Sequence, residues 1–80
     1  MPDVFNYTDY REFLRDYYAE QKARKTSFSY QYLARKAGLS NKGFVHNVVT
    51  GRKNLSPRSA ARLAPAVTDS DRAAEYFELL

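Results

Sequence analysis

The fold is decided by the stretch LARKAGLS at residues 33–40, followed by Phe44. Gly38 can adopt a positive φ and so end a short helix, and only one residue separates it from Ser40, a residue type that caps helix starts. A small alanine in the first helix lets the second helix cross close to it, and the apolar side chains of the stretch fill the angle between them. This order of residues predicts a helix-turn-helix from about Ser29 to Thr50.

Further helices are predicted on both sides of this motif, from apolar residues at spacings of three and four and from capping residues. A serine followed by a proline starts the fourth helix, and we expect Pro65 to break or fray it near its end. Thr68 and Asp71 have capping-box spacing, which indicates a helix start. The expected helices are Asp9 to about Lys22, Ser29 to Ala37, Ser40 to about Thr50, Ser56-Pro57 to about Pro65, and about Thr68–Ser70 to Leu80.

No segment shows the strict alternation of a β-strand, so the predicted fold class is all-α: a compact five-helix bundle with a central helix-turn-helix. With 80 residues the chain forms a single domain near the lower size limit for unaided stability. It has no cysteine, so its core must come from helix packing and from seven tyrosines and five phenylalanines. Because the last helix stops at Leu80 in mid-periodicity, we expect residues 1–80 to be the N-terminal fragment of a longer protein.

The sequence indicates neither a membrane span nor a secretory signal. No apolar run approaches the roughly 18 to 20 residues that cross a bilayer. The N-terminus also lacks the basic-then-apolar order of a signal peptide. We therefore expect a soluble cytoplasmic protein without a membrane partner.

Charge is segregated along the chain. Residues 1–20 and residues 69–80 each sum to −3, whereas residues 21–68 carry +10 and contain no carboxylate. Ordinary solvated surfaces interleave both signs, so this pattern favours a face that meets phosphates over a merely solvated basic surface. The basic residues of the middle segment are Lys22, Arg24, Lys25, Arg35, Lys36, Lys42, Arg52, Lys53, Arg58 and Arg62.

Residues 29–67 resemble the Cro and phage-repressor class of helix-turn-helix domains, in which L-A-x-x-x-G precedes a recognition helix, a glycine and a basic loop. More narrowly, the chain is similar to the N-terminal head of the Fibrobacter major paralogous domain family of presumed bacterial regulators. This second resemblance rests on DVF at residues 3–5, YTDYR at 7–11, FL at 13–14, FSY at 28–30, LARKAG at 33–38, GRKNLSP at 51–57 and EYFELL at 75–80. It implies a lambda-repressor-like, DNA-binding head. The chain departs from the wider class at Asn47, where an apolar residue is usual, and at Gly51, which falls one residue late.

Two rules indicate the DNA face of the recognition helix, expected at about 41–50. Helical periodicity places Phe44, Val45, Val48 and Val49 in one apolar stripe and leaves Lys42, Gly43, His46, Asn47 and Thr50 outward. The resemblance instead implies that Asn41, Lys42, Val45, His46 and Val49 point into the groove. Both rules select Lys42 and His46. The candidate base contacts are Asn41, Lys42, Val45 and His46, with Val45 left open between groove and core.

Contacts to DNA phosphates are expected from polar residues at helix starts and in the loop after the recognition helix. For Arg52 and Lys53 the alternative is a solvated turn. Lys22, Arg24 and Lys25 are weaker candidates. The predicted phosphate contacts are Tyr30, Gln31, Ser40, Arg52, Lys53 and Asn54.

Nothing in the sequence favours an enzyme. His46 is the only histidine, and no carboxylate in residues 21–68 could orient it or share a metal ion with it. We expect no catalytic residue, no metal, no cofactor and no small-molecule substrate.

The function predicted from these features is sequence-specific binding of double-stranded DNA by a bacterial transcriptional regulator associated with the nucleoid. The alternative is a helical adaptor, whose tyrosine-rich first helix would contact a protein partner. RNA binding ranks lower, because the aromatic residues fall mostly at core spacing. One short helix in a groove buries little surface, so we expect weak binding by these residues alone. A homodimer, formed through the last helix or a region beyond residue 80, would supply the full affinity.

Overall fold

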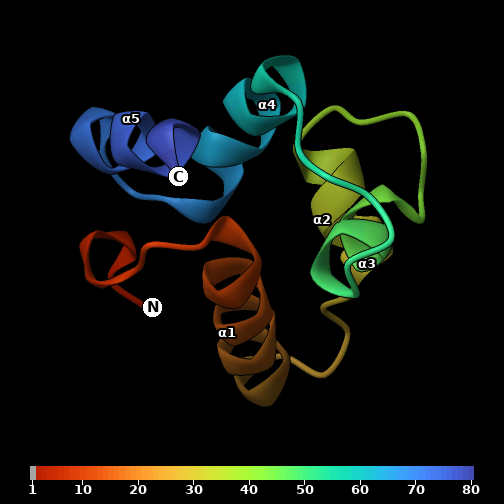
Figure 1. The fold of residues 1–80 in the computed structure, drawn as a ribbon. Coiled ribbons are helices and arrows are strands. Elements are labelled where there is room, and N and C mark those ends of the chain that lie inside the picture. The colour runs from red at the N-terminus through yellow and green to blue at the C-terminus, as the bar shows by residue number, and fades with distance from the viewer. Residues whose placement is uncertain (1) are drawn as a thin grey trace.

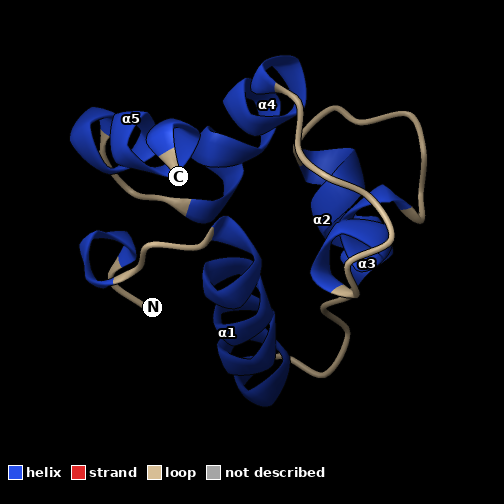
Figure 2. Cartoon of the chain, viewed as in Figure 1, coloured by secondary structure: helices blue, strands red, loops and turns tan. Residues whose placement is uncertain are grey.

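The computed structural model describes residues 2–80, which form five α-helices and a short 3-10 turn (Figures 1 and 2). No strand occurs within these residues, so the predicted all-α class and the number of α-helices are confirmed. The 3-10 turn was not predicted from the sequence. The elements are η1 (Val4–Asn6), α1 (Tyr10–Arg24), α2 (Tyr30–Lys36), α3 (Phe44–Val49), α4 (Pro57–Val67) and α5 (Asp71–Leu79).

Side-chain caps fix the starts of four helices. Asp9 accepts the amide of Arg11 at 2.9 Å, and Ser29 accepts the amide of Tyr32 at 3.0 Å. Ser56 caps α4 in the same manner and is followed by a proline at the first helical position. These three starts agree with the sequence prediction, because an N-cap depends on residues only two or three positions apart.

Two expectations at the end of α4 are wrong. The helix continues through Pro65 to Val67. A proline has no amide hydrogen, so the carbonyl of Ala61 loses its helical donor, but Pro65 and Ala61 both lie on the exposed face of the helix. The capping box between Thr68 and Asp71 does not form. Ser70 caps α5 instead, and the Thr68 hydroxyl donates to the carbonyl of Ala64 at 2.6 Å, which closes the end of α4.

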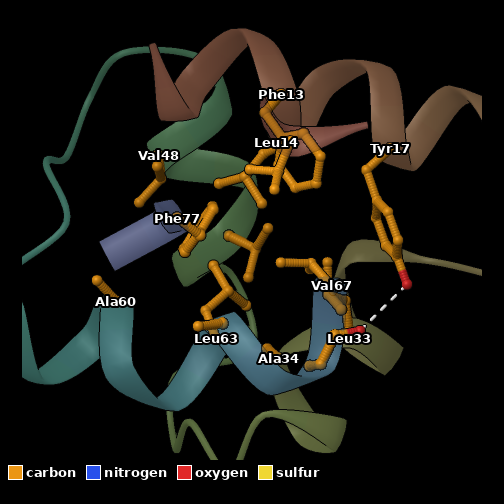
Figure 3. Packing of buried hydrophobic residues seen from close by; sticks show 14 of the residues in the cluster. Phe13, Leu14, Tyr17, Leu33, Ala34, Val48, Ala60, Leu63, Val67 and Phe77 are labelled. Carbon is orange, nitrogen blue, oxygen red and sulfur yellow. Dashed lines mark hydrogen bonds between the residues drawn. The ribbon is translucent and has the colours of Figure 1, made fainter. Parts of the chain in front are cut away.

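The core lies where all five helices meet (Figure 3). Phe13 from α1 and Phe77 from α5 are fully buried and meet edge to face, with ring centroids 5.8 Å apart. The buried Tyr17 keeps its hydroxyl satisfied by donating to the carbonyl of Ala66 at 3.2 Å, the dashed line in Figure 3. The expected core of packed helices and aromatic side chains is therefore present.

The acidic C-terminal helix lies apart from the two connections that flank α3. The acidic α5 packs on α4 and on η1, and α5 and η1 lie on the far side of the molecule from α3 (Figure 1). The connections from α2 to α3 and from α3 to α4 run over the opposite side, and both belong to the basic segment. Within residues 2–80, none of the helices combines the length and the apolar character needed to cross a membrane.

Candidate nucleic-acid interface

The candidate interface is built on α2, α3 and the connection between them, residues 37–43. Gly38 ends α2 with φ at +77°, as predicted, and the amide of Leu39 donates back to the carbonyl of Ala34 at 2.9 Å. Ala34 is buried, and α2 packs against α3. The two helices of the predicted helix-turn-helix are therefore in contact across a tight turn.

The third helix begins later than predicted, at Phe44, and Ser40 is not its cap. Asn41 forms a local turn instead: its side-chain oxygen accepts the amide of Gly43 at 2.9 Å, and its carbonyl accepts the amide of Phe44 at 3.2 Å. Residues 41–43 thus precede the helix, and α3 has six residues in place of about ten. Asn41 and Lys42 are exposed on this turn.

The outward face of α3 agrees with helical periodicity and not with the pattern of the repressor class. Val45 and Val48 are each 0% exposed, so the prediction that Val45 contacts a base is wrong. Val45 is buried because it continues the apolar stripe that packs on α1 and α2. His46 is exposed, whereas Val49 is half-buried against the core. Asn47, the departure from the class, is half-buried, and its backbone carbonyl accepts the amides of Arg52 and Lys53 beyond the end of the helix.

An aromatic row joins the first three helices beside this face. Tyr18 of α1 stacks on Tyr30 of α2 with ring centroids 3.8 Å apart and planes 7° from parallel. The rings of Tyr30 and His46 meet edge to face, with their centroids 5.4 Å apart. Burial raises the pKa of Tyr30, and the neighbouring Tyr18 raises it further. The Tyr30 hydroxyl therefore stays protonated at neutral pH and can donate a hydrogen bond to an anion.

Three of the predicted contact residues line one shallow depression between α2 and the turn. Gln31 comes from the first turn of α2, and Ser40 and Lys42 come from the connection to α3. Arg35 lines the same depression. The fold thus brings a predicted base contact and two predicted phosphate contacts to one concave surface.

The basic loop, residues 51–55, follows α3 and is held from behind by α1. Gly51 adopts φ at +88°, and the side chains of Arg52 and Lys53 are exposed. Arg11 of α1 donates to the carbonyl of Val48 at 2.6 Å, to the carbonyl of Lys53 at 3.1 Å and to the Asn54 side-chain oxygen at 3.0 Å. The side-chain oxygen of Asn54 is therefore engaged within the protein, which leaves its amide nitrogen for the predicted phosphate contact.

Arg11 was not predicted from the sequence, because it lies in the acidic first segment and about forty residues from its partners. Tyr10 also links α1 to the basic loop, since its hydroxyl accepts the amide of Leu55 at 3.1 Å. The only feature of the sequence that could have indicated this role is that Arg11 is a basic residue at a helix start that is otherwise acidic. The weaker candidates have local roles: Lys22 donates to the carbonyl of Phe28 at 2.8 Å, and Arg24 pairs with Glu20 at 3.9 Å.

Comparisons with protein-family models, curated proteins and solved structures gave no match. The resemblance to the repressor class therefore stays a prediction from the sequence. Within residues 2–80, no group of three or more histidine, aspartate or glutamate side chains is placed to hold a metal ion.

Proposed function

We propose that this chain binds double-stranded DNA in a sequence-specific way, as the DNA-binding part of a repressor-like transcriptional regulator. The observation that carries the proposal is the position of Lys42 and His46. Lys42 is exposed just before α3 and His46 is exposed on it, and both belong to residues 21–68, a segment that contains ten cations and no carboxylate. A helix in the major groove presents outward side chains to base edges, and phosphates attract the surrounding cations.

Lys42 and His46 are the proposed base-reading residues. A lysine donates to the O6 or N7 of guanine, and a histidine donates or accepts according to its tautomer. The edge contact with Tyr30 limits the orientations of the His46 ring. Asn41 is the third candidate, although its side-chain oxygen already accepts the amide of Gly43. Its amide nitrogen is the group that would face a base acceptor.

Arg52, Lys53, Tyr30, Gln31 and Ser40 are the proposed phosphate contacts, with Asn54 contributing its amide nitrogen. Such contacts fix the position of the protein on the duplex without reading its sequence. The hydrogen bonds of Arg11 hold the loop that carries Arg52 and Lys53 against the end of α3. These bonds thereby fix the position of the phosphate-binding loop relative to the base-reading helix.

The adaptor alternative gains no support from the tyrosines of α1. Tyr17 is buried, Tyr18 stacks on Tyr30, and the hydroxyl of Tyr10 accepts an amide of the basic loop. These side chains serve the interior of the fold, so an adaptor would have to use a different face.

The proposal is tested by selecting preferred sites from a random duplex library and measuring affinity for the selected and for random DNA. Removing a good base contact costs about 1 to 3 kcal/mol of discrimination, so Lys42→Ala/His46→Ala should reduce the preference for the selected site at least about tenfold. The matched control is Lys25→Ala, an exposed lysine at the connection between α1 and α2. Failure to enrich any sequence, or equal loss of preference in the control, would contradict the proposal.

We further propose that full affinity requires a homodimer, because α3 has only six residues and a single short helix buries little surface in a groove. Sedimentation of the chain with a selected duplex should then show two protein copies for each tightly bound site. A single copy bound with nanomolar affinity at physiological salt would exclude this requirement.

A further inference from the structure

A second basic surface lies at the other end of α3 from the basic loop. The depression that holds Arg35 and Lys42 shares Leu39 and Ser40 with a second depression, which runs on to the start of α4. Because the two depressions have these residues in common, they adjoin at the turn and lie along one strip of surface. We name this surface the turn strip, and its cations are Arg35, Lys42, Arg58 and Arg62.

The arginines of α4 are fixed toward the turn by the fold. Arg58 and Arg62 are four residues apart in one helix, so their side chains project from the same face. Arg62 donates one guanidinium hydrogen to the carbonyl of Gly38 at 2.9 Å, which ties α4 to the end of α2. A guanidinium has five N–H donors, so this bond uses only a small part of its capacity. Ser59, whose hydroxyl shares a hydrogen bond with Ser56, lines the same depression.

The charge of the turn strip points to a polyanion. All four cations are exposed, and the segment from which they come supplies no carboxylate that could neutralise them. Like charges gathered on a concave surface repel one another and raise the local positive potential, which attracts anions. The hydroxyls of Ser40 and Ser59 add donors that suit phosphate oxygens.

Resting on the proposed function, we infer that the turn strip binds phosphates of the DNA backbone and forms a second anchor for α3. The basic loop follows α3 and the turn strip precedes it, so the two anchors lie at opposite ends of the helix that reads the bases. Anchors at both ends set the angle of the helix in the groove, which a single anchor leaves free. Arg35, Arg58 and Arg62 are thus phosphate contacts in addition to those of the loop and to Gln31 and Ser40, which line the same strip.

The test measures anisotropy of a fluorescein-labelled, random-sequence duplex between about 50 and 200 mM salt, a range over which phosphate contacts dominate the salt dependence. The decisive variant is Arg58→Gln, and its matched control is Arg72→Gln. Both residues are exposed and occupy the second position of their helices, α4 and α5. Arg58→Gln should lower the slope of log affinity against log salt by about 0.9 for each phosphate that Arg58 neutralises, whereas Arg72→Gln should leave the slope unchanged.

A charge reversal keeps the experiment decisive if the effect of neutralising a single arginine is small. Arg58→Glu places the first carboxylate in the turn strip and should weaken binding more than Arg58→Gln, while its urea unfolding midpoint reports that the fold is intact. If the wild type fails to bind at low salt, the proposed function falls together with this inference. If the wild type binds with a steep salt slope and both Arg58 variants retain that slope, the inference alone is overturned.

Discussion

Replacing Arg11 with alanine should destabilise the fold more than any other single exchange of a charged residue on α1. Arg11 is half-buried and spans from α1 to the end of α3 and to the basic loop, with hydrogen bonds of 2.6, 3.1 and 3.0 Å. The substitution removes all three at once. The carbonyl of Val48 then keeps only backbone donors at the helix end, among them the amide of Gly51 at 3.1 Å.

The magnitude follows from the surroundings of these bonds. A hydrogen bond from a charged donor contributes about 1.5 to 3 kcal/mol, and only the bond to Val48 lies in a partly buried place. The two exposed bonds contribute less, so Arg11→Ala should lower the free energy of unfolding by about 2 to 3 kcal/mol. A domain of this length has about 4 to 12 kcal/mol in total, so the loss is a large fraction of it.

The assay is urea unfolding followed by circular dichroism, with Arg15→Ala as the matched control on the same helix. The side chain of Arg15 is 63% exposed and only pairs with Asp16 at 3.8 Å, so its removal should cost about 0.5 kcal/mol or less. Arg11→Lys should recover part of the loss, because a compact ammonium does not span the three acceptors as the guanidinium fork does. Equal destabilisation by Arg11→Ala and Arg15→Ala would refute the assignment of Arg11 as the link between α1 and the end of α3.

Three further predictions concern a turn, a tyrosine and the core. Gly51→Ala should lower the free energy of urea unfolding by about 1 to 2 kcal/mol, because the backbone has φ at +88° there, even though an added Cβ would have open space. Gly43→Ala, at φ −93°, should be neutral or stabilising. A larger loss for Gly43→Ala than for Gly51→Ala would contradict this backbone argument. The hydrogen bond to Asp16 raises the pKa of Tyr7 from 10.0 to about 12. This hydrogen bond therefore stabilises the fold fully below pH 10, and its contribution is lost as the pH rises through 12. Asp16→Asn should move this pKa, followed by carbon-13 NMR, back toward its ordinary value, and an unchanged pKa would exclude the Asp16 carboxylate as the cause. Val45→Ala should lower the free energy of unfolding by about 2 kcal/mol and leave the DNA preference of the folded protein unchanged, whereas a changed preference would return Val45 to the groove.

The parts of the fold that were predictable from the sequence are those that depend on near neighbours. Ser29 and Ser56 were identified as caps, and Gly38 as a helix end, because the hydrogen bonds and the positive φ involve residues only a few positions apart. The start of α3 was not predictable in this way. Ser40 and Asn41 both offer local side-chain bonds, and the choice between them depends on how the turn packs against its neighbours.

The candidate site shows the same division. The apolar period alone placed Val45 in the core and His46 outside, while the pattern of a related class placed Val45 in the groove. A family pattern describes the average over many helices, whereas the residues that α3 buries are decided by its own apolar stripe. The links made by Arg11 and Arg62 join residues 24 to 43 positions apart, so no local signal could show them.

DNA binding itself is tested most simply by the anisotropy of labelled random-sequence duplex DNA titrated with the wild-type chain at several salt concentrations. We expect measurable binding at low salt and a steep loss of affinity as salt rises, because exposed cations at both ends of α3 displace counterions from phosphates. Arg52→Ala/Lys53→Ala should make that dependence shallower. Absence of binding at low salt would contradict the proposal that the basic side of this fold is a DNA-binding surface.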